Sequence, residues 1–356
     1  MVLKILDKYL IKEVFRYMMI CHAVLFFIYL VVDFFQKIDD FIEAKVSKFT
    51  IIKFFFYKSP FIISQLIPVS LLLSVIITAG LMKRNNELIS LRSSGISLYR
   101  IFMPFFFFSL LTSLFSFLFS ETVVPYSSSM CQEVWNKEVR KGKYRRFFRR
   151  RNIWYKGKNY IYWIECLEGR RMKRAIFYFF ERGFFLKKRI QAKEVLWNGS
   201  EWIAEDVLIQ ERCGKRYVTK RLRRLKLSIS ETPESFLRPV RKPEEMNFWE
   251  LKRFAKQIEE EGYDARRYLV DAYVKTAFPF INIIVVLIGI PATLKLKSDN
   301  IPLAVSLGIL ICFTYLLVMS IFRSLGISGI LPPFLSAWSA NLFFLLLGIY
   351  MIMHID

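Results

Sequence analysis

The chain has 356 residues, of which 54% are hydrophobic and 36 are phenylalanine, so it is too apolar for an ordinary water-soluble protein of this length. It also carries 53 lysines and arginines against 30 acidic residues, a formal net charge of +23. The two facts fit together only if apolar and charged residues are segregated along the chain. With two histidines and five cysteines in no CxxC spacing, neither catalytic residues nor a metal site is predicted.

Six apolar runs have the length needed to cross a bilayer. They are residues 17–35, 60–82, 101–120, 272–294, 301–322 and 333–353. The sixteen residues before the first run alternate lysine with leucine, isoleucine and valine at helical spacing. This pattern predicts an amphipathic helix in the membrane interface and no cleavable signal peptide. We therefore expect six transmembrane helices with a large polar insert between the third and the fourth.

The short loops set the expected orientation, because their basic residues favour the cytoplasmic side. Such residues occur in three regions. Lys4, Lys8, Lys12 and Arg16 precede the first run, Lys83, Arg84, Arg92 and Arg100 lie between the second and third, and Lys295 and Lys297 lie between the fourth and fifth. All three regions fall on one side of a six-span topology. Both termini are therefore predicted to be cytoplasmic, and the insert is predicted to lie outside.

The insert has the pattern of an all-β domain. Residues 156–159 lie between two aromatic-rich stretches, and Asn198-Gly199 lies between two further strand candidates. Both short segments have the composition of tight turns between strands. Such spacing predicts a sandwich or jelly-roll-like sheet. We expect the β-domain core to hold most of the aromatic residues Trp154, Tyr160, Tyr162, Trp163, Trp197 and Trp202.

The predicted division is residues 1–130 for helices one to three, 131–245 for the β-domain, and 246–356 for a connecting helix and helices four to six.

From residue 121 to 271 the chain has 36 basic and 21 acidic residues, a net charge of +15. In a cytosolic protein this would indicate nucleic acid, but an external domain would meet anionic lipid or glycolipid instead. A generally basic surface without a specific ligand is the alternative.

The polar segment 83–100, KRNNELISLRSSGISLYR, is predicted to form a short helix over residues 84–95 on the cytoplasmic face. Asn86 can cap this helix, Glu87 lies in its first turn, and Gly95 suits its end. The chain has no phosphate-binding GxxxxGK[ST] loop and no chain of ionisable residues inside its apolar runs. Energy for any uphill transport must therefore come from a partner on this face.

Several stretches resemble the LptF/LptG (YjgP/YjgQ) permease family. They are ILDKYLIKEVFR, NNELISLRSSGIS, VVPYSS and NFWELKRFAKQIEEEGYDARRYLVDAYVKTAFPF. The resemblance covers essentially the whole chain and is strongest at its two ends. The stretches YIYWIE and VLWNGSEW are more similar to LptG than to LptF.

The resemblance implies an inner-membrane subunit of the ATP-binding-cassette exporter of lipopolysaccharide. Such a subunit would pair with a paralogous LptF-like permease and with a cytoplasmic ATPase dimer. It would have no cofactor of its own, since the partner uses the ATP, and no nucleic-acid partner. The β-domain would be periplasmic and would pass lipopolysaccharide to bridge proteins of like fold by an edge-to-edge contact.

The resemblance also assigns roles to residues. The segment that couples to the ATPase would include Glu87, Leu88, Leu91, Arg92 and Gly95, with the two leucines pressing against the ATPase or the membrane surface. The lysines expected to contact lipid phosphates are Lys37, Lys53 and Lys275. The chain departs from the family's lysine-rich pattern at the end of the first span, where it carries Asp33, Asp39 and Asp40. Lysines that only extend to the headgroups are the alternative.

Two further function classes stay open from the residues alone. A secondary transporter would move its substrate under an ion gradient without an ATPase. A non-transporting membrane scaffold would use its β-domain as a docking module.

Overall fold

The computed structural model describes residues 5–139, 149–156, 160–181, 185–213, 216–227, 241–260, 264–296 and 300–354. The chain divides into two compact units. One unit comprises Met1–Val134, Lys242–Ala255 and Arg266–Asp356, and the other comprises Trp135–Arg241 and Lys256–Ala265.

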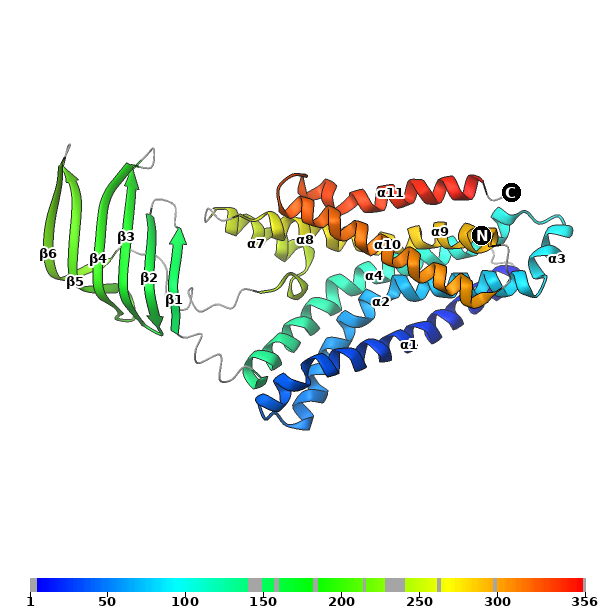
Figure 1. Ribbon diagram of the computed structural model, residues 1–356, viewed down its shortest axis with the longest axis horizontal. Coiled ribbons are helices and arrows are strands. Elements are labelled where there is room, and N and C mark those ends of the chain that lie inside the picture. Colours follow the sequence, from blue (N-terminus) through cyan, green and yellow to red (C-terminus); the bar gives the residue numbers. More distant parts are fainter. Residues whose placement is uncertain are drawn as a thin grey trace. The chain divides into compact units, whose positions relative to one another are not determined.

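The first unit is a helical bundle (Figure 1). Its helices are α1 (Ile5–Glu43), α2 (Lys48–Arg84), α3 (Glu87–Ser93), α4 (Leu98–Val134), α8 (Arg266–Ala277), α9 (Ile281–Lys295), α10 (Ile301–Ile327) and α11 (Pro333–Met353). The segment that returns from the second unit adds the 3-10 turn η2 (Pro243–Glu245) and the start of α7 (Phe248–Glu260). Six of its helical segments are long and apolar enough to cross a membrane, which confirms the predicted number of spans.

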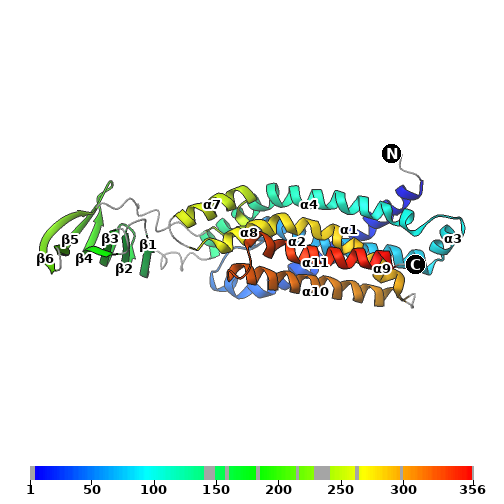
Figure 2. The same cartoon turned by 90° about the horizontal axis from the view of Figure 1, so that it is seen from above.

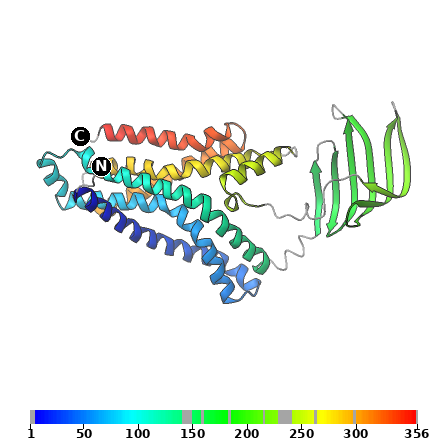
Figure 3. The same cartoon turned by 180° about the vertical axis from the view of Figure 1, so that it is seen from behind.

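Helix α1 is continuous, so the expected interfacial helix and the first span form one element of 39 residues. At 1.5 Å per residue it is about 58 Å long, well beyond the roughly 30 Å of a bilayer's hydrocarbon core. Helix α3 and both chain ends lie at one end of the bundle, and the turn between α1 and α2 lies at the other (Figures 1 and 3).

The fourth span is broken where Pro279 predicts an interruption. Helix α8 ends at Ala277, a 3-10 turn η3 (Phe278–Phe280) follows, and α9 continues the span. Neighbouring helices bond the carbonyl groups of this turn region. The Ser113 hydroxyl donates to the Pro279 carbonyl at 2.9 Å, and the Asn341 amide donates to the Ala277 carbonyl at 2.8 Å. The hydroxyl of Tyr315 in turn donates to Asn341 Oδ1, which joins α10, α11 and α8 through buried polar groups.

The bundle core lies where α2, α4 and α9 pack against one another. Figure 2 shows the same bundle from above. The hydrophobic side chains of α2 supply much of it, among them Leu71, Leu72, Val75 and Ile76. In contrast, only 6% of the residues in an apolar 18-residue stretch of α1 are buried within the chain. The outer faces of α1 are therefore available to lipid or to another protein.

The second unit contains one antiparallel sheet of six strands in simple chain order. The strands are β1 (Arg149–Lys156), β2 (Tyr160–Glu168), β3 (Arg171–Glu181), β4 (Phe185–Trp197), β5 (Trp202–Cys213) and β6 (Arg216–Leu227). The predicted all-β insert between the third and fourth spans is confirmed. Its described strands form an up-and-down meander, whereas the jelly-roll pattern has strand crossovers between two sheets.

Rows of directly opposed side chains build the core of this sheet. One row runs through Tyr162, Phe177, Ile190 and Ile209 on four successive strands, and all four are buried. Trp202 is also fully buried, as predicted, but Trp154 on the edge strand β1 is exposed, so its predicted core position is wrong.

The turn signals of the insert have different outcomes. Asn198 and Gly199 do form the turn between β4 and β5, where Gly199 has φ +106° and Asn198 Oδ1 accepts the backbone N–H groups of Ser200 and Glu201. Strands β1 and β2 pair as predicted, and residues 157–159 between them lie outside the described part of the chain.

Candidate functional site

The short helix predicted between the second and third spans is present as α3, which is two turns long. Gly95 ends it as predicted: its φ is +82°, its N–H donates to the Arg92 carbonyl at 2.9 Å, and the Ile96 N–H donates to the Leu91 carbonyl at 3.1 Å. This pair of bonds is the Schellman motif, which requires a left-handed residue after the helix. Asn86 occupies the N-cap position as predicted, but its φ is 60° and its side chain makes no capping hydrogen bond.

Helix α3 turns its leucines inward. Leu88 is only 5% exposed and belongs to the bundle core, and Leu91 packs against the same core. The contact with a partner predicted for Leu88 is therefore corrected, since its side chain anchors α3 to its own chain. The outward face carries Ile89, which is 64% exposed, and the exposed Arg92.

Two polar contacts connect this segment to the start of α1. Tyr9 donates its hydroxyl hydrogen to Glu87 Oε2 at 3.3 Å. Arg100, at the start of α4, holds the buried carboxylate of Asp7 with both terminal nitrogens, each 2.9 Å from one oxygen. This two-point contact fixes the beginning of α1 beside the ends of the α3 segment.

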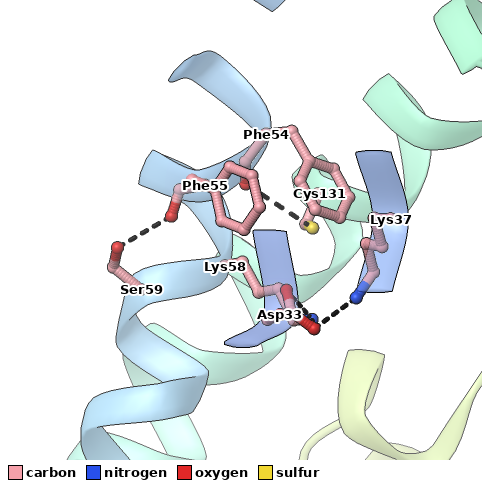
Figure 4. Close-up of polar contacts among 7 residues, drawn as sticks. All are labelled: Asp33, Lys37, Phe54, Phe55, Lys58, Ser59 and Cys131. Atoms are coloured by element: carbon pink, nitrogen blue, oxygen red, sulfur yellow. Dashed lines mark hydrogen bonds and ion pairs between the residues drawn. The ribbon is translucent and has the colours of Figure 1, made fainter. Parts of the chain in front are cut away.

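A second charged cluster lies between α1 and α2, toward the turn that joins them, and Figure 4 shows its side chains. The carboxylate of Asp33 accepts from Lys37, one turn later on α1, and from Lys58 on α2. Lys58 Nζ lies 2.7 Å from Oδ1 and 2.6 Å from Oδ2. The Asp33 side chain is 7% exposed, against 23% for Lys37 and 17% for Lys58. The acid is therefore covered by two bases that are themselves accessible.

Aromatic side chains support this cluster. Phe41 of α1 packs edge-on against Phe54 and Phe55 of α2, with ring centroids 5.6 and 6.2 Å apart. The ammonium group of Lys58 lies 5.9 Å from the centre of the Phe54 ring, within cation–π range. Cys131 of α4 donates its thiol hydrogen to the Phe54 carbonyl, with sulfur and oxygen 3.8 Å apart (Figure 4). Three helices therefore hold the cluster in place.

The other two predicted lysines lie elsewhere. Lys53 is exposed and has no ion pair among the described residues. Lys275 donates to the Met246 carbonyl at 2.6 Å and lines a cavity of about 440 Å³ between α2, α4, α8, α10 and η2. The same cavity contains Asp271 and Arg323, which form an ion pair at 2.6 Å. Neither Lys37 nor Lys53 lines this cavity, so the three lysines do not form one site.

Within the described part of the chain no group of three or more histidine, cysteine, aspartate or glutamate side chains is placed to hold a metal ion. Four cysteines whose side chains are described, Cys21, Cys131, Cys166 and Cys312, are free thiols.

The comparison with protein families decides what these clusters belong to. The family model described as "Lipopolysaccharide export system permease LptF/LptG" matches residues 8–354, nearly the whole chain. The chain belongs to the LptF/LptG family. A search of curated proteins gives no match. The LptF/LptG match makes the chain a transport subunit rather than an enzyme, and it covers both permease types together.

Sequence reasoning missed several residues of these LptF/LptG clusters. Lys58 stands at the start of the second apolar run, 25 positions from Asp33, and only the α1–α2 hairpin brings the two together. Asp7 and Arg100 are 93 positions apart. The sequence does show that these charged residues stand beside or within apolar runs. It does not show which charged residue pairs with which.

Proposed function

We propose that this chain is one of two permease subunits of an ATP-driven exporter, which takes lipopolysaccharide from the inner membrane toward a periplasmic bridge. ATP hydrolysis belongs to a cytoplasmic ABC ATPase dimer, and this chain needs no cofactor of its own. The match of residues 8–354 to the lipopolysaccharide export permease family carries the proposal. The paired subunit is a related LptF-like permease, and this chain takes the LptG role.

The ATPase is proposed to dock on α3. The Schellman end and the buried Leu88 hold the helix rigidly, while Ile89 and Arg92 remain exposed on the same short segment. A rigid helix that presents an apolar side chain beside a positive charge is suited to a groove on another protein. Both chain ends lie at the same end of the bundle as α3, which places them on the cytoplasmic side in this proposal (Figure 1).

The lipid is proposed to meet the cluster of Asp33, Lys37 and Lys58 at the other end. Lipopolysaccharide carries phosphate groups, and two accessible ammonium groups beside one covered carboxylate attract them. Lys275 lines a separate cavity, and its ammonium group is already bonded to a backbone carbonyl. We therefore place the phosphate contact at Lys37 and Lys58, and the β-domain, periplasmic in this proposal, passes the lipid on.

Recovery of the partner ATPase from native membranes tests this function. Ile89→Asp puts a charge on the exposed face of α3 without touching the core, so the amount of ATPase that copurifies should fall by about tenfold or more. Glu87→Ala should lower it less, because Glu87 contacts Tyr9 of its own chain. The matched control is Ile52→Asp at the opposite end of the bundle, where Ile52 is exposed to a similar degree; this variant should keep its ATPase.

A second measurement separates the proposed function from the alternatives. The purified complex should hydrolyse ATP faster when lipopolysaccharide is added. A complex without any ATPase, or protein that moves lipid alone under an ion gradient, would overturn the proposal. Unchanged ATPase recovery with Ile89→Asp would remove α3 as the docking site.

A further inference from the structure

The charges of the outer cluster do not balance. Lys37 and Lys58 both bind the single carboxylate of Asp33, and no other carboxylate pairs with either lysine within the described residues. Two ammonium groups and one carboxylate leave one positive charge without a counter-ion. This differs from an ordinary structural ion pair, in which the charges cancel.

The surroundings make this imbalance costly. Phe41, Phe54 and Phe55 are buried beside the cluster, and the carboxylate is nearly covered. In such a low-dielectric place an unpaired charge is unfavourable, and an anion that neutralises it is held strongly. Because the lysines are more exposed than Asp33, an anion that arrives from outside meets the ammonium groups first.

A phosphate monoester fits this site better than the carboxylate does. It carries a charge of about −1.5 to −2 and three acceptor oxygens, so it can satisfy both ammonium groups at once. The carboxylate of Asp33 already occupies the two lysines, with Lys58 contacting both of its oxygens. Phosphate binding must therefore compete with Asp33.

We infer that Asp33 is a resident counter-ion that occupies Lys37 and Lys58 in place of a lipid phosphate and is exchanged for it during transport. This inference rests on the proposed function. Competition from Asp33 lowers the affinity of the site for phosphate, since the lysine–carboxylate contacts must be given up on binding and are regained on release. An exporter must release its lipid after binding it. The carboxylate of Asp33 favours this release because it binds Lys37 and Lys58 again as the phosphate leaves. Asp33 thus tunes affinity without contacting the lipid.

The test compares Asp33→Asn with the wild-type chain in the purified complex. Asparagine keeps the shape of the side chain but removes its charge. The variant should bind bisphosphorylated lipid A about tenfold more tightly, and release it correspondingly more slowly, because the competing anion is gone. Affinity for the same lipid after phosphatase treatment should be unchanged. Asp39→Asn, an exposed acid of the same helix, is the matched control and should behave as the wild type.

A double-mutant cycle keeps the inference testable if Asp33→Asn is poorly recovered. Lys37→Met leaves a balanced Lys58–Asp33 pair and should bind phosphorylated lipid weakly. Adding Asp33→Asn to Lys37→Met frees Lys58 and should restore binding. A double variant that binds no better than Lys37→Met would overturn the role of Asp33.

The remaining outcomes separate this inference from the proposed function. If Lys37→Met and Lys58→Met bind the phosphorylated lipid like the wild type, the lysines are not the phosphate site and the proposed function loses its lipid contact. If both lysine variants lose binding but Asp33→Asn gains none, the proposed function stands and the counter-ion inference fails. Inorganic phosphate serves as the second probe: if it displaces the lipid at equal concentration, the site is one for free phosphate, and the inference about the lipid is overturned.

Discussion

The two ends of the membrane unit each carry a buried aspartate on α1, and the two differ in how that charge is met. Near the start of α1, Asp7 meets one arginine, and each carboxylate oxygen has its own guanidinium nitrogen at 2.9 Å. Near its other end, Asp33 meets two lysines that share its oxygens. The first cluster sets one guanidinium group against one carboxylate, and the second sets two ammonium groups against one carboxylate.

This difference indicates different tasks for two clusters that look alike in the sequence. The two-point contact between Asp7 and Arg100 joins α1 to α4 beside α3 and is suited to holding this end of the bundle in one arrangement. The unbalanced cluster lies on the α1–α2 hairpin with α4 packed beside it, and it is the proposed site for an anion. The rise of 1.5 Å per residue places the two aspartates about 39 Å apart along one helix. Helix α1 therefore connects the proposed ATPase-docking end to the proposed lipid end.

The largest expected effect comes from breaking the balanced pair. Arg100→Gln leaves the covered carboxylate of Asp7 without its arginine, and we expect the unfolding temperature of the purified protein to fall by roughly 10 °C. The double variant Asp7→Asn/Arg100→Gln removes both charges and should regain most of that loss. Thermal unfolding in detergent measures both. If Lys58→Gln is equally destabilising, the two clusters do not differ as described.

The next effect concerns binding at the unbalanced cluster. Lys58→Met leaves Lys37 paired with Asp33, so the fold should remain close to wild-type stability while affinity for phosphorylated lipid A falls by about tenfold. Lys53→Met is the control, since Lys53 lies on the same helix and is exposed without an ion pair among the described residues. Lipid binding by the purified complex separates them. Equal losses in both variants would mean that general surface charge attracts the lipid.

The sequence predicts the membrane spans and the inserted domain, but it does not predict which charged residues pair at the two ends of the bundle. Apolar runs separated by polar segments indicate six spans and an insert, because a bilayer demands about twenty apolar residues for each crossing. The positive φ required after a short helix explains why Gly95 was predictable. The pairing of Asp33 with Lys58 was not, because it depends on how the α1–α2 hairpin closes.

Two wrong predictions have the same physical origin. The three-residue spacing of Leu88 and Leu91 marks an apolar face of α3, but the pattern does not say what covers that face. The bundle's own core covers it. Likewise, an aromatic residue such as Trp154 has strong strand preference wherever it stands, and its place on the edge strand β1 leaves it exposed.

A smaller effect is expected between the two charged ends, where neutral polar groups join the helices. Tyr315→Phe removes the hydroxyl that donates to Asn341 and leaves Asn341 Oδ1 without that donor in the buried core. We expect a loss of about 1 kcal/mol in the free energy of unfolding. Tyr350→Phe, on the exposed side of α11, should have no measurable effect. Equal behaviour of the two variants would show that the polar contact adds nothing to the bundle.

The smallest expected effect is at Gly95, and it tests whether the proposed docking of the ATPase depends on a fixed α3. A Cβ atom at Gly95 meets nothing within 4 Å, so only the backbone conformation at φ +82° opposes Gly95→Ala. Alanine in the left-handed region costs about 1 kcal/mol, which should loosen the end of α3 and lower ATPase recovery by a few-fold. Gly80→Ala is the control, because Gly80 has no positive φ and its nearest side-chain atoms are 3.9 Å from the new Cβ. That variant should keep full ATPase recovery and stability. If Gly95→Ala also keeps full recovery, the Schellman end is not what holds α3 ready for its partner, and the contact of Glu87 with Tyr9 becomes the next candidate.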